Sequence, residues 1–213
     1  MKFIPSILLF FFLLSFSSCS TKTVEPELPD ANPPAPVIPE EPIPEKEKML
    51  WFDAEANFER FSKKENITYY LDLAKTTGFN KIVVDVRPVQ GDALFKSSYL
   101  TPLTDLAGIH IERDWDYLQF FIDEAHKREL KVTVSTTIFT AGLPSSKNGM
   151  AYRDDTWNGK TCLEYTKDQG LIDIKNDKTK VSAFLNPVLP EVQDFCLNFI
   201  KELVTNYDFD GFA

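Results

Sequence analysis

Acidic side chains stand near the ends of two short apolar segments, where a parallel sheet would bring them to one edge. In the first segment Asp53 and Glu55 share a face of an extended strand, because strand side chains alternate, and Asn57 lies just beyond them. In the second segment Asp85 and Arg87 also share a face. Carboxylates that gather near a cleft raise one another's pKa and can act as acid and base. The pattern indicates acid–base chemistry at strand ends.

Paired carboxylates suit the cleavage of glycosidic bonds, in which one protonates the leaving oxygen while the other attacks or activates water. Two plainer interpretations stay open. Carboxylates at strand ends are often only solvated surface groups, and Asp85 with Arg87 could form a structural ion pair that holds the following loop. Nearby aromatic side chains could stack on sugar rings or simply fill the core: Trp51, Phe52, Phe58, Phe95 and Tyr99.

The remaining reactive residue types form no pattern of a metal or cofactor site. His110 and His126 have no neighbours at metal-ligand spacing, and three cysteines with two histidines cannot supply a zinc-finger site. The eight glycines form no phosphate-binding run, so no cofactor is expected. A formal net charge of −9 argues against a nucleic-acid partner. Two interpretations remain for Cys162 and Cys196: a disulfide, or packing of Cys196 as a small apolar side chain.

The elements that must position these residues alternate between strand and helix. The expected strands cover residues 49–55, 81–87, 130–139 and 210–213. The first helix carries its apolar residues at helical spacing from Ile67 to Ala74 and ends near Gly78. Asp114 is placed to cap the second helix, and Pro190 suits the first turn of the third. A long polar insertion is expected over residues 141–184.

Strands that alternate with helices predict an α/β fold with a parallel sheet covered by helices. A barrel and an open doubly wound sheet both satisfy this pattern. Residues 49–213 supply three and a half strand–helix units, whereas a full eightfold barrel needs about 250 residues. We therefore expect an incomplete chain.

The N-terminal segment is typical of an exported lipoprotein. Residues 1–18 combine a cationic start with a short apolar run, which predicts a signal peptide rather than a transmembrane helix. Small residues lead directly to Cys19, which resembles a bacterial lipobox and predicts acylation; an ordinary signal peptide with a chance cysteine is the alternative. Residues 19–48 hold eight of the fourteen prolines among many glutamates. This composition predicts an extended tether, although a proline-rich recognition motif stays open.

Several stretches in this order resemble the glycosyl hydrolase-like family 10 proteins. The stretches are Leu50–Phe58, Val83–Pro88, Gly91–Ser97, Glu124–Arg128, Leu185–Val192 and Tyr207–Phe212. The resemblance implies an exported (β/α)8 TIM barrel, distantly related to the alpha-amylase superfamily and truncated here to about its first half. One departure is the end of the third strand, where family members often have asparagine and this chain has Thr136 and Thr137.

The resemblance also implies a retaining-type glycosidase whose nucleophile is a carboxylate at the end of strand four. That residue is expected directly after Ala213, and the general acid on a later strand. The substrate-binding residues that carry over are Asp85, Arg87 and Asn186, together with Asp53 and Asn57.

These observations lead to one main hypothesis about function and two rivals. Residues 49–213 are expected to be part of a glycoside hydrolase that acts on polysaccharide or oligosaccharide. The lipid on Cys19 would anchor it to the outer membrane, on the periplasmic face or the cell surface. The 213 residues alone are expected to be inactive. The rivals are a lipoprotein that binds glycans without cutting them and an amidase or deacetylase on the same scaffold.

Overall fold

The computed structural model describes residues 46–213. The predicted signal peptide, Cys19 and nearly all of the predicted tether lie outside this range. Within it, no helix is both long enough and apolar enough to cross a membrane.

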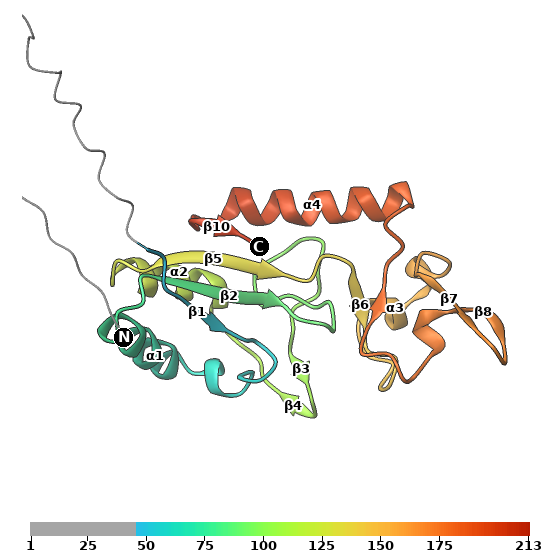
Figure 1. Cartoon of the computed structure of the whole chain (residues 1–213), viewed down its shortest axis with the longest axis horizontal. Helices are drawn as coiled ribbons and strands as arrows, with labels where there is room; N and C mark the ends of the chain where they lie inside the picture. The colour runs from blue at the N-terminus through green and yellow to red at the C-terminus, as the bar shows by residue number, and fades with distance from the viewer. Residues whose placement is uncertain (1–45) are drawn as a thin grey trace, which may run out of the picture. The chain divides into compact units, whose positions relative to one another are not determined.

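A four-stranded parallel sheet forms the centre of the fold (Figure 1). Its strands are β1 (Met49–Phe52), β2 (Lys81–Arg87), β5 (Lys131–Thr136) and β10 (Gly211–Phe212). They lie side by side in chain order, and the pairing aligns Trp51, Val83, Thr133 and Gly211 across the sheet. The predicted α/β class with a parallel sheet is confirmed. The described residues form no closed barrel, so this part of the prediction is not confirmed.

Three longer helices follow the strands. They are α1 (Lys64–Thr76), α2 (Tyr117–His126) and α4 (Pro190–Asn206). Helix α1 buries Ile67, Leu71 and Ala74 and ends before Gly78, whose φ of +86° is the left-handed conformation that favours glycine. Helix α4 begins with Pro190 in its first turn, as predicted. These apolar helix faces and the alternate strand residues Ile82, Val84, Val132 and Val134 form one core.

The residue that caps α2 differs from the prediction. Asp116, not Asp114, is the N-cap, and its Oδ1 accepts the N–H of Gln119 at 3.1 Å. Both aspartates precede the helix by a few residues. Tyr117, the first residue of α2, is buried, and its burial fixes the position of the first turn and so makes Asp116 the cap.

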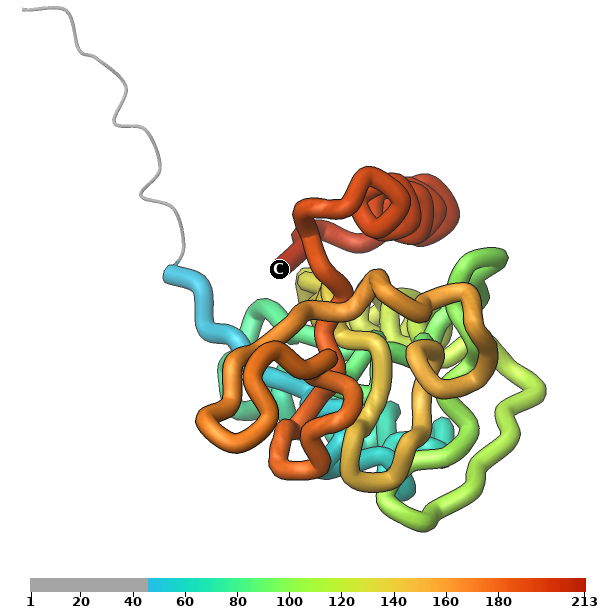
Figure 2. Tube along the Cα trace, turned by 90° about the vertical axis from the view of Figure 1, so that its right-hand side faces the viewer, coloured from blue at the N-terminus to red at the C-terminus, as the bar shows by residue number. Residues whose placement is uncertain are grey.

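The strand–helix connections carry small elements that the sequence did not predict. Between β2 and α2 lie β3 (Asp105–Leu106) and β4 (Ile109–His110). The predicted insertion contains β6 (Thr140–Gly142), α3 (Met150–Arg153), β7 (Leu163–Thr166), β8 (Gly170–Asp173) and β9 (Ala183–Phe184). Short 3-10 turns cover Arg60–Ser62, Asp155–Trp157 and Ile174–Asn176. Figure 1 shows β6, α3, β7 and β8 beyond the tips of β2 and β5, and Figure 2 shows α4 above these elements.

The open question about the cysteines is settled for the two described thiols. Cys162 and Cys196 are both free, so the disulfide alternative is wrong. Cys196, on α4, is 5% exposed and packs in the core, as the interpretation of it as a small apolar side chain predicted.

Candidate functional site

Three carboxylates lie at the carboxyl ends of the neighbouring strands β1 and β2. Asp53 directly follows β1, and Asp85 belongs to β2 one position beyond the Phe52–Val84 pair. The Asp53 carboxylate accepts the N–H of Ala56 at 2.7 Å, which shapes the turn that carries Glu55. We call Asp53, Glu55 and Asp85 the carboxylate cluster.

Glu55 connects the two strand ends. Its Oε1 accepts the N–H of Val89, just after β2, at 2.9 Å. The negative charges of Asp53 and Glu55 both act on Asp85. The structure therefore brings together the acidic residues that the sequence placed on two separate segments.

Burial sets the protonation of Asp85. The side chain is half-buried, and desolvation of its charged form raises the pKa to about 6, against the opposing effect of the backbone N–H groups of Arg87 and Ala54. The charges of Asp53 and Glu55 act in the same direction as burial and contribute less to this value. Asp85 is consequently an ionised hydrogen-bond acceptor above pH 6 and a proton donor below it. A carboxyl group with this pKa can bind sugar hydroxyls or exchange a proton near neutral pH.

Arg87 does not share an accessible face with Asp85, although the strand alternation predicted that it would. Its side chain is 0% exposed. A β-bulge shifts the pairing of β2 with β5 between Asp85 and Arg87, which breaks the strict alternation that put both on one face. Among the described residues no ion pair joins Asp85 to Arg87.

The guanidinium of Arg87 instead holds the chain after β5. Nη2 donates to the carbonyl oxygen of Thr140 at 2.6 Å, and Nη1 donates to Thr140 Oγ1 at 3.1 Å and to the carbonyl oxygens of Thr137 and Ile138. The ring of Phe199 on α4 lies 5.1 Å from the guanidinium carbon. Burial lowers the pKa of Arg87 to about 10, so it stays charged at neutral pH. Arg87 therefore has a structural role, because it holds the loop after β5. This resembles the alternative of a structural ion pair, except that the partners of Arg87 are backbone oxygens and not the Asp85 carboxylate.

The two predicted asparagines also serve local turns. Asn57 Nδ2 donates to the carbonyl oxygen of Asp53 at 3.0 Å, and its Oδ1 accepts from Arg60 at 2.6 Å. Asn186 lies between β9 and α4, where its Oδ1 accepts the N–H of Val188 at 3.1 Å. No hydrogen bond among residues 46–213 joins Asn186 to the carboxylate cluster. Asn57 thus borders the cluster, and Asn186 is not brought to it by a direct contact.

Tyr117 is a neighbour of the cluster that sequence reasoning missed. It is 3% exposed, and burial raises its pKa, with the charges of Asp85 and Asp53 acting in the same direction. Its hydroxyl therefore stays protonated at physiological pH. In the sequence, Tyr117 is only an aromatic residue at the start of an apolar helix, and this pattern does not predict that it lies near the carboxylate cluster.

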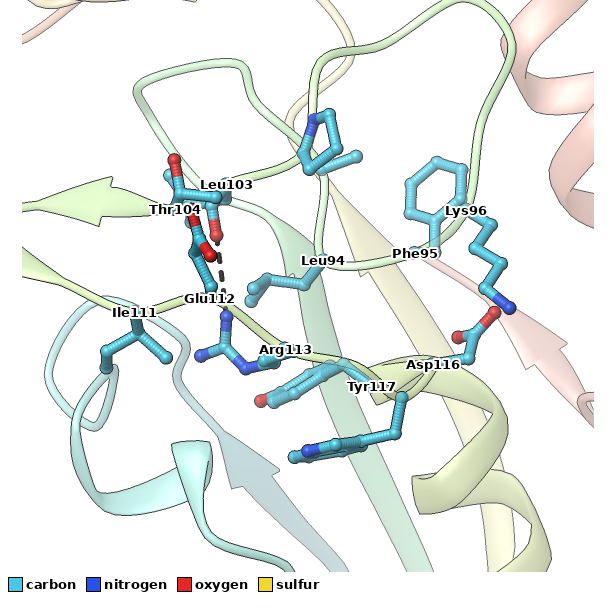
Figure 3. A pocket seen from close by; sticks show the side chains of 13 residues that line it. Leu94, Phe95, Lys96, Leu103, Thr104, Ile111, Glu112, Arg113, Asp116 and Tyr117 are labelled. Atoms are coloured by element: carbon cyan, nitrogen blue, oxygen red, sulfur yellow. Dashed lines mark hydrogen bonds between the residues drawn. The ribbon is translucent and has the colours of Figure 1, made fainter.

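A hollow of about 340 Å³ lies beside Tyr117, between residues 93–104 and 111–117 (Figure 3). Arg113 stands in its middle, 5.5 Å from the Tyr117 ring and 5.0 Å from that of Phe58, and donates to the carbonyl oxygen of Leu103 at 3.4 Å. Nε and Nη2 of Arg113 are covered and lack partners among the described residues. Stacking between two rings fixes the guanidinium there.

No cluster of metal-ligating side chains occurs within residues 46–213.

Comparison with known proteins finds a matching family and several similar proteins. The model of a family described as Glycosyl hydrolase-like 10 matches residues 47–213. The chain is 33% identical over 174 residues to an S-layer-related protein of Niallia circulans, a match that covers 78% of this chain and 11% of that protein. It is 30% identical over 143 residues to the glycosyl hydrolase DigH of Escherichia coli strain K12, which covers 66% of this chain and 31% of DigH. The chain thus spans less than a third of the length of either relative.

The similar solved structures include an alpha-amylase. An Anoxybacillus alpha-amylase superposes with a TM-score of 0.50 at 16% identity, over 78% of this chain and 40% of the amylase. At this identity the likeness concerns the fold alone.

Proposed function

The chain belongs to the glycosyl hydrolase-like 10 family, and from this membership we propose that it is the N-terminal part of a glycoside hydrolase that cleaves O-glycosidic bonds in a polysaccharide or oligosaccharide. The observation that carries the proposal is the carboxylate cluster at adjacent parallel strand ends. Ligands of parallel α/β folds meet this edge of the sheet. The relatives support a glycosidase-like protein of greater length than this chain.

The cluster has the chemistry needed to hold a sugar. Above pH 6 Asp85 is an ionised acceptor for sugar hydroxyls, and Asp53 is exposed beside it. Hydrogen bonds to a charged group each contribute about 1.5–3 kcal/mol. In the proposal Asp53 and Asp85 bind the substrate directly, with Asn57 at their border. Arg87 and Asn186 act by positioning the surrounding loops.

The four-stranded sheet is, in this proposal, the first half of a (β/α)8 barrel. All four strands are parallel and in chain order, as successive barrel strands are, and the likeness to an alpha-amylase fold supports this. Strand β10 would be the fourth barrel strand. The nucleophile would then be a carboxylate just beyond Ala213, and the 213 residues alone would be inactive.

Export and anchoring are part of the proposal on sequence grounds. Residues 1–18 would be the signal peptide, Cys19 the acylated residue, residues 19–48 the tether and residues 49–213 the enzymatic part. Mass spectrometry of the mature N-terminus tests this: a diacylglyceryl group on Cys19 is expected. An unmodified or uncleaved N-terminus would contradict it.

The experiment that tests the function uses the full-length protein with a panel of neutral and acidic polysaccharides. We expect new reducing ends and shorter oligosaccharides from at least one glycan. Binding without new reducing ends would favour a glycan-binding lipoprotein instead. Release of acetate or ammonia from an intact glycan chain would favour a deacetylase or amidase.

A further inference from the structure

A hollow separate from the carboxylate cluster lies where the insertion meets the first turns of α4. Its volume is about 340 Å³. Three stretches far apart in the sequence line it: residues 91–101, residues 150–157 and Phe195. None of these residues belongs to the proposed strand-end site.

Two aromatic side chains that line this hollow are accessible. Tyr99, from the β2–β3 connection, is 48% exposed. Trp157 is half-buried and packs edge-on against Phe195 with the ring centroids 4.7 Å apart, so its orientation is fixed. Exposed aromatic side chains that line a hollow are characteristic of small-molecule sites, because they offer a rigid apolar surface with little loss of conformational freedom.

A fixed guanidinium supplies the polar part. Arg153 Nη2 lies 2.5 Å from Asp92 Oδ2, which also accepts a hydrogen bond from Gln90 Nε2 at 2.7 Å. Asp92 is 1% exposed, whereas the Arg153 side chain is 35% exposed. The buried carboxylate therefore holds an arginine whose remaining N–H groups are available at the hollow.

The same carboxylate has an unused oxygen. Asp92 Oδ1 is buried and has no hydrogen-bond partner within the described part of the chain. A buried acceptor without a donor costs about 1–3 kcal/mol. A hydroxyl group that reached the floor of the hollow would satisfy Oδ1 while a neighbouring hydroxyl accepted from Arg153. This donor–acceptor pair matches adjacent hydroxyls on a sugar ring.

We propose that the hollow is a glycan-binding subsite that takes one neutral pyranose residue, stacked between Tyr99 and Trp157 and hydrogen-bonded to Arg153 and Asp92. The ligand is neutral because Asp92 already compensates the charge of Arg153, and exposed Asp154 adds a negative charge at the rim. The subsite would hold a part of the glycan away from the strand ends, and its binding does not require hydrolysis.

The test measures binding of neutral hexaoses of glucose and of N-acetylglucosamine, with hexagalacturonate as the acidic probe, by titration calorimetry on the full-length protein. All variants carry Asp85→Asn, which weakens binding at the strand ends. Loss of half of the aromatic sandwich in Tyr99→Ala or Trp157→Ala should weaken binding of a neutral hexaose about tenfold, or about 1.4 kcal/mol. Tyr69→Ala is the control, because Tyr69 is 62% exposed on α1 and does not line the hollow.

Thermal unfolding of each variant separates lost binding from lost structure. Should Trp157→Ala fail to fold, Tyr99→Ala decides, because Tyr99 is about half exposed and lies outside the core. Equal affinities in all variants, no binding of any hexaose, or binding of hexagalacturonate alone would overturn the subsite. Cleavage is tested separately, on the full-length protein with Asp85 intact. If the hexaoses bind through Tyr99 and that protein forms no new reducing ends from any polysaccharide of the panel, the proposed function is contradicted and the subsite stands.

Discussion

Asp85→Asn is expected to stabilise the fold at neutral pH, although it removes a residue of the proposed site. Burial raises the pKa of Asp85 from 3.8 to about 6. A carboxyl group that holds its proton more tightly in the folded state adds stability at low pH, and this contribution is lost as the pH rises from about 4 to about 6. Above that range Asp85 is ionised in the folded protein, and its partly desolvated charge no longer contributes this stability.

The magnitude follows from the difference between the two pKa values. About two units, at about 1.4 kcal/mol per unit, correspond to about 3 kcal/mol. Asn has nearly the same shape without the charge, and its Oδ1 still accepts from the backbone N–H groups of Arg87 and Ala54. The free energy of unfolding of Asp85→Asn should therefore exceed that of the wild type by up to about 3 kcal/mol at pH 8 and differ little at pH 4.

Urea unfolding of both proteins at pH 4 and pH 8 measures this difference. Asp72→Asn is the matched control, since the hydrogen bond from Arg128 Nε, 2.6 Å long, lowers the pKa of the exposed Asp72 carboxyl. That variant should gain no stability at pH 8. An Asp85→Asn protein that is no more stable than the wild type at pH 8, or equally shifted at both pH values, would refute the reasoning.

Three further substitutions test the packing around the site by thermal or urea unfolding. Arg87→Met should destabilise the fold by about 3 kcal/mol, because the buried carbonyl oxygens after β5 lose their donor; unchanged stability would contradict its positioning role. Gly91→Ala should cost about 1–3 kcal/mol or more, since the added Cβ would stand 2.5 Å from the Thr140 carbonyl oxygen at a φ of +84°; a neutral effect would show that this approach is looser. Tyr207→Phe should cost about 1–3 kcal/mol through loss of the 2.7 Å hydrogen bond to Asp116, and a wild-type midpoint would count against it.

The regular elements were predictable because their signals are local. The run from Lys81 to Arg87 is rich in β-branched residues, and β2 has these bounds. Pro190 fixes the start of α4 because its ring suits the first turn. Asp53 and Asp85 could be paired in advance, since parallel strands end at one edge of the sheet.

Other features depend on tertiary contacts that a linear pattern does not contain. The bulge that turns Arg87 away from Asp85 inserts one residue into β2. The sequence of this strand contains no signal that predicts the bulge. The choice of Asp116 over Asp114 depends on which apolar residue reaches the core. The insertion was predicted only as a long polar segment. The strands in it are two to four residues long, too short for a sequence periodicity to reveal them.

The measurement that tests the central claim most directly is kcat/KM of the full-length Asp85→Asn protein at pH 7, on an oligosaccharide that the wild type cleaves. Loss of a charged acceptor for a sugar hydroxyl, worth about 1.5–3 kcal/mol, predicts a fall of roughly tenfold to more than a hundredfold, with Asp72→Asn unchanged. An Asp85→Asn enzyme within about twofold of the wild type would contradict the claim that the carboxylate cluster binds the glycan.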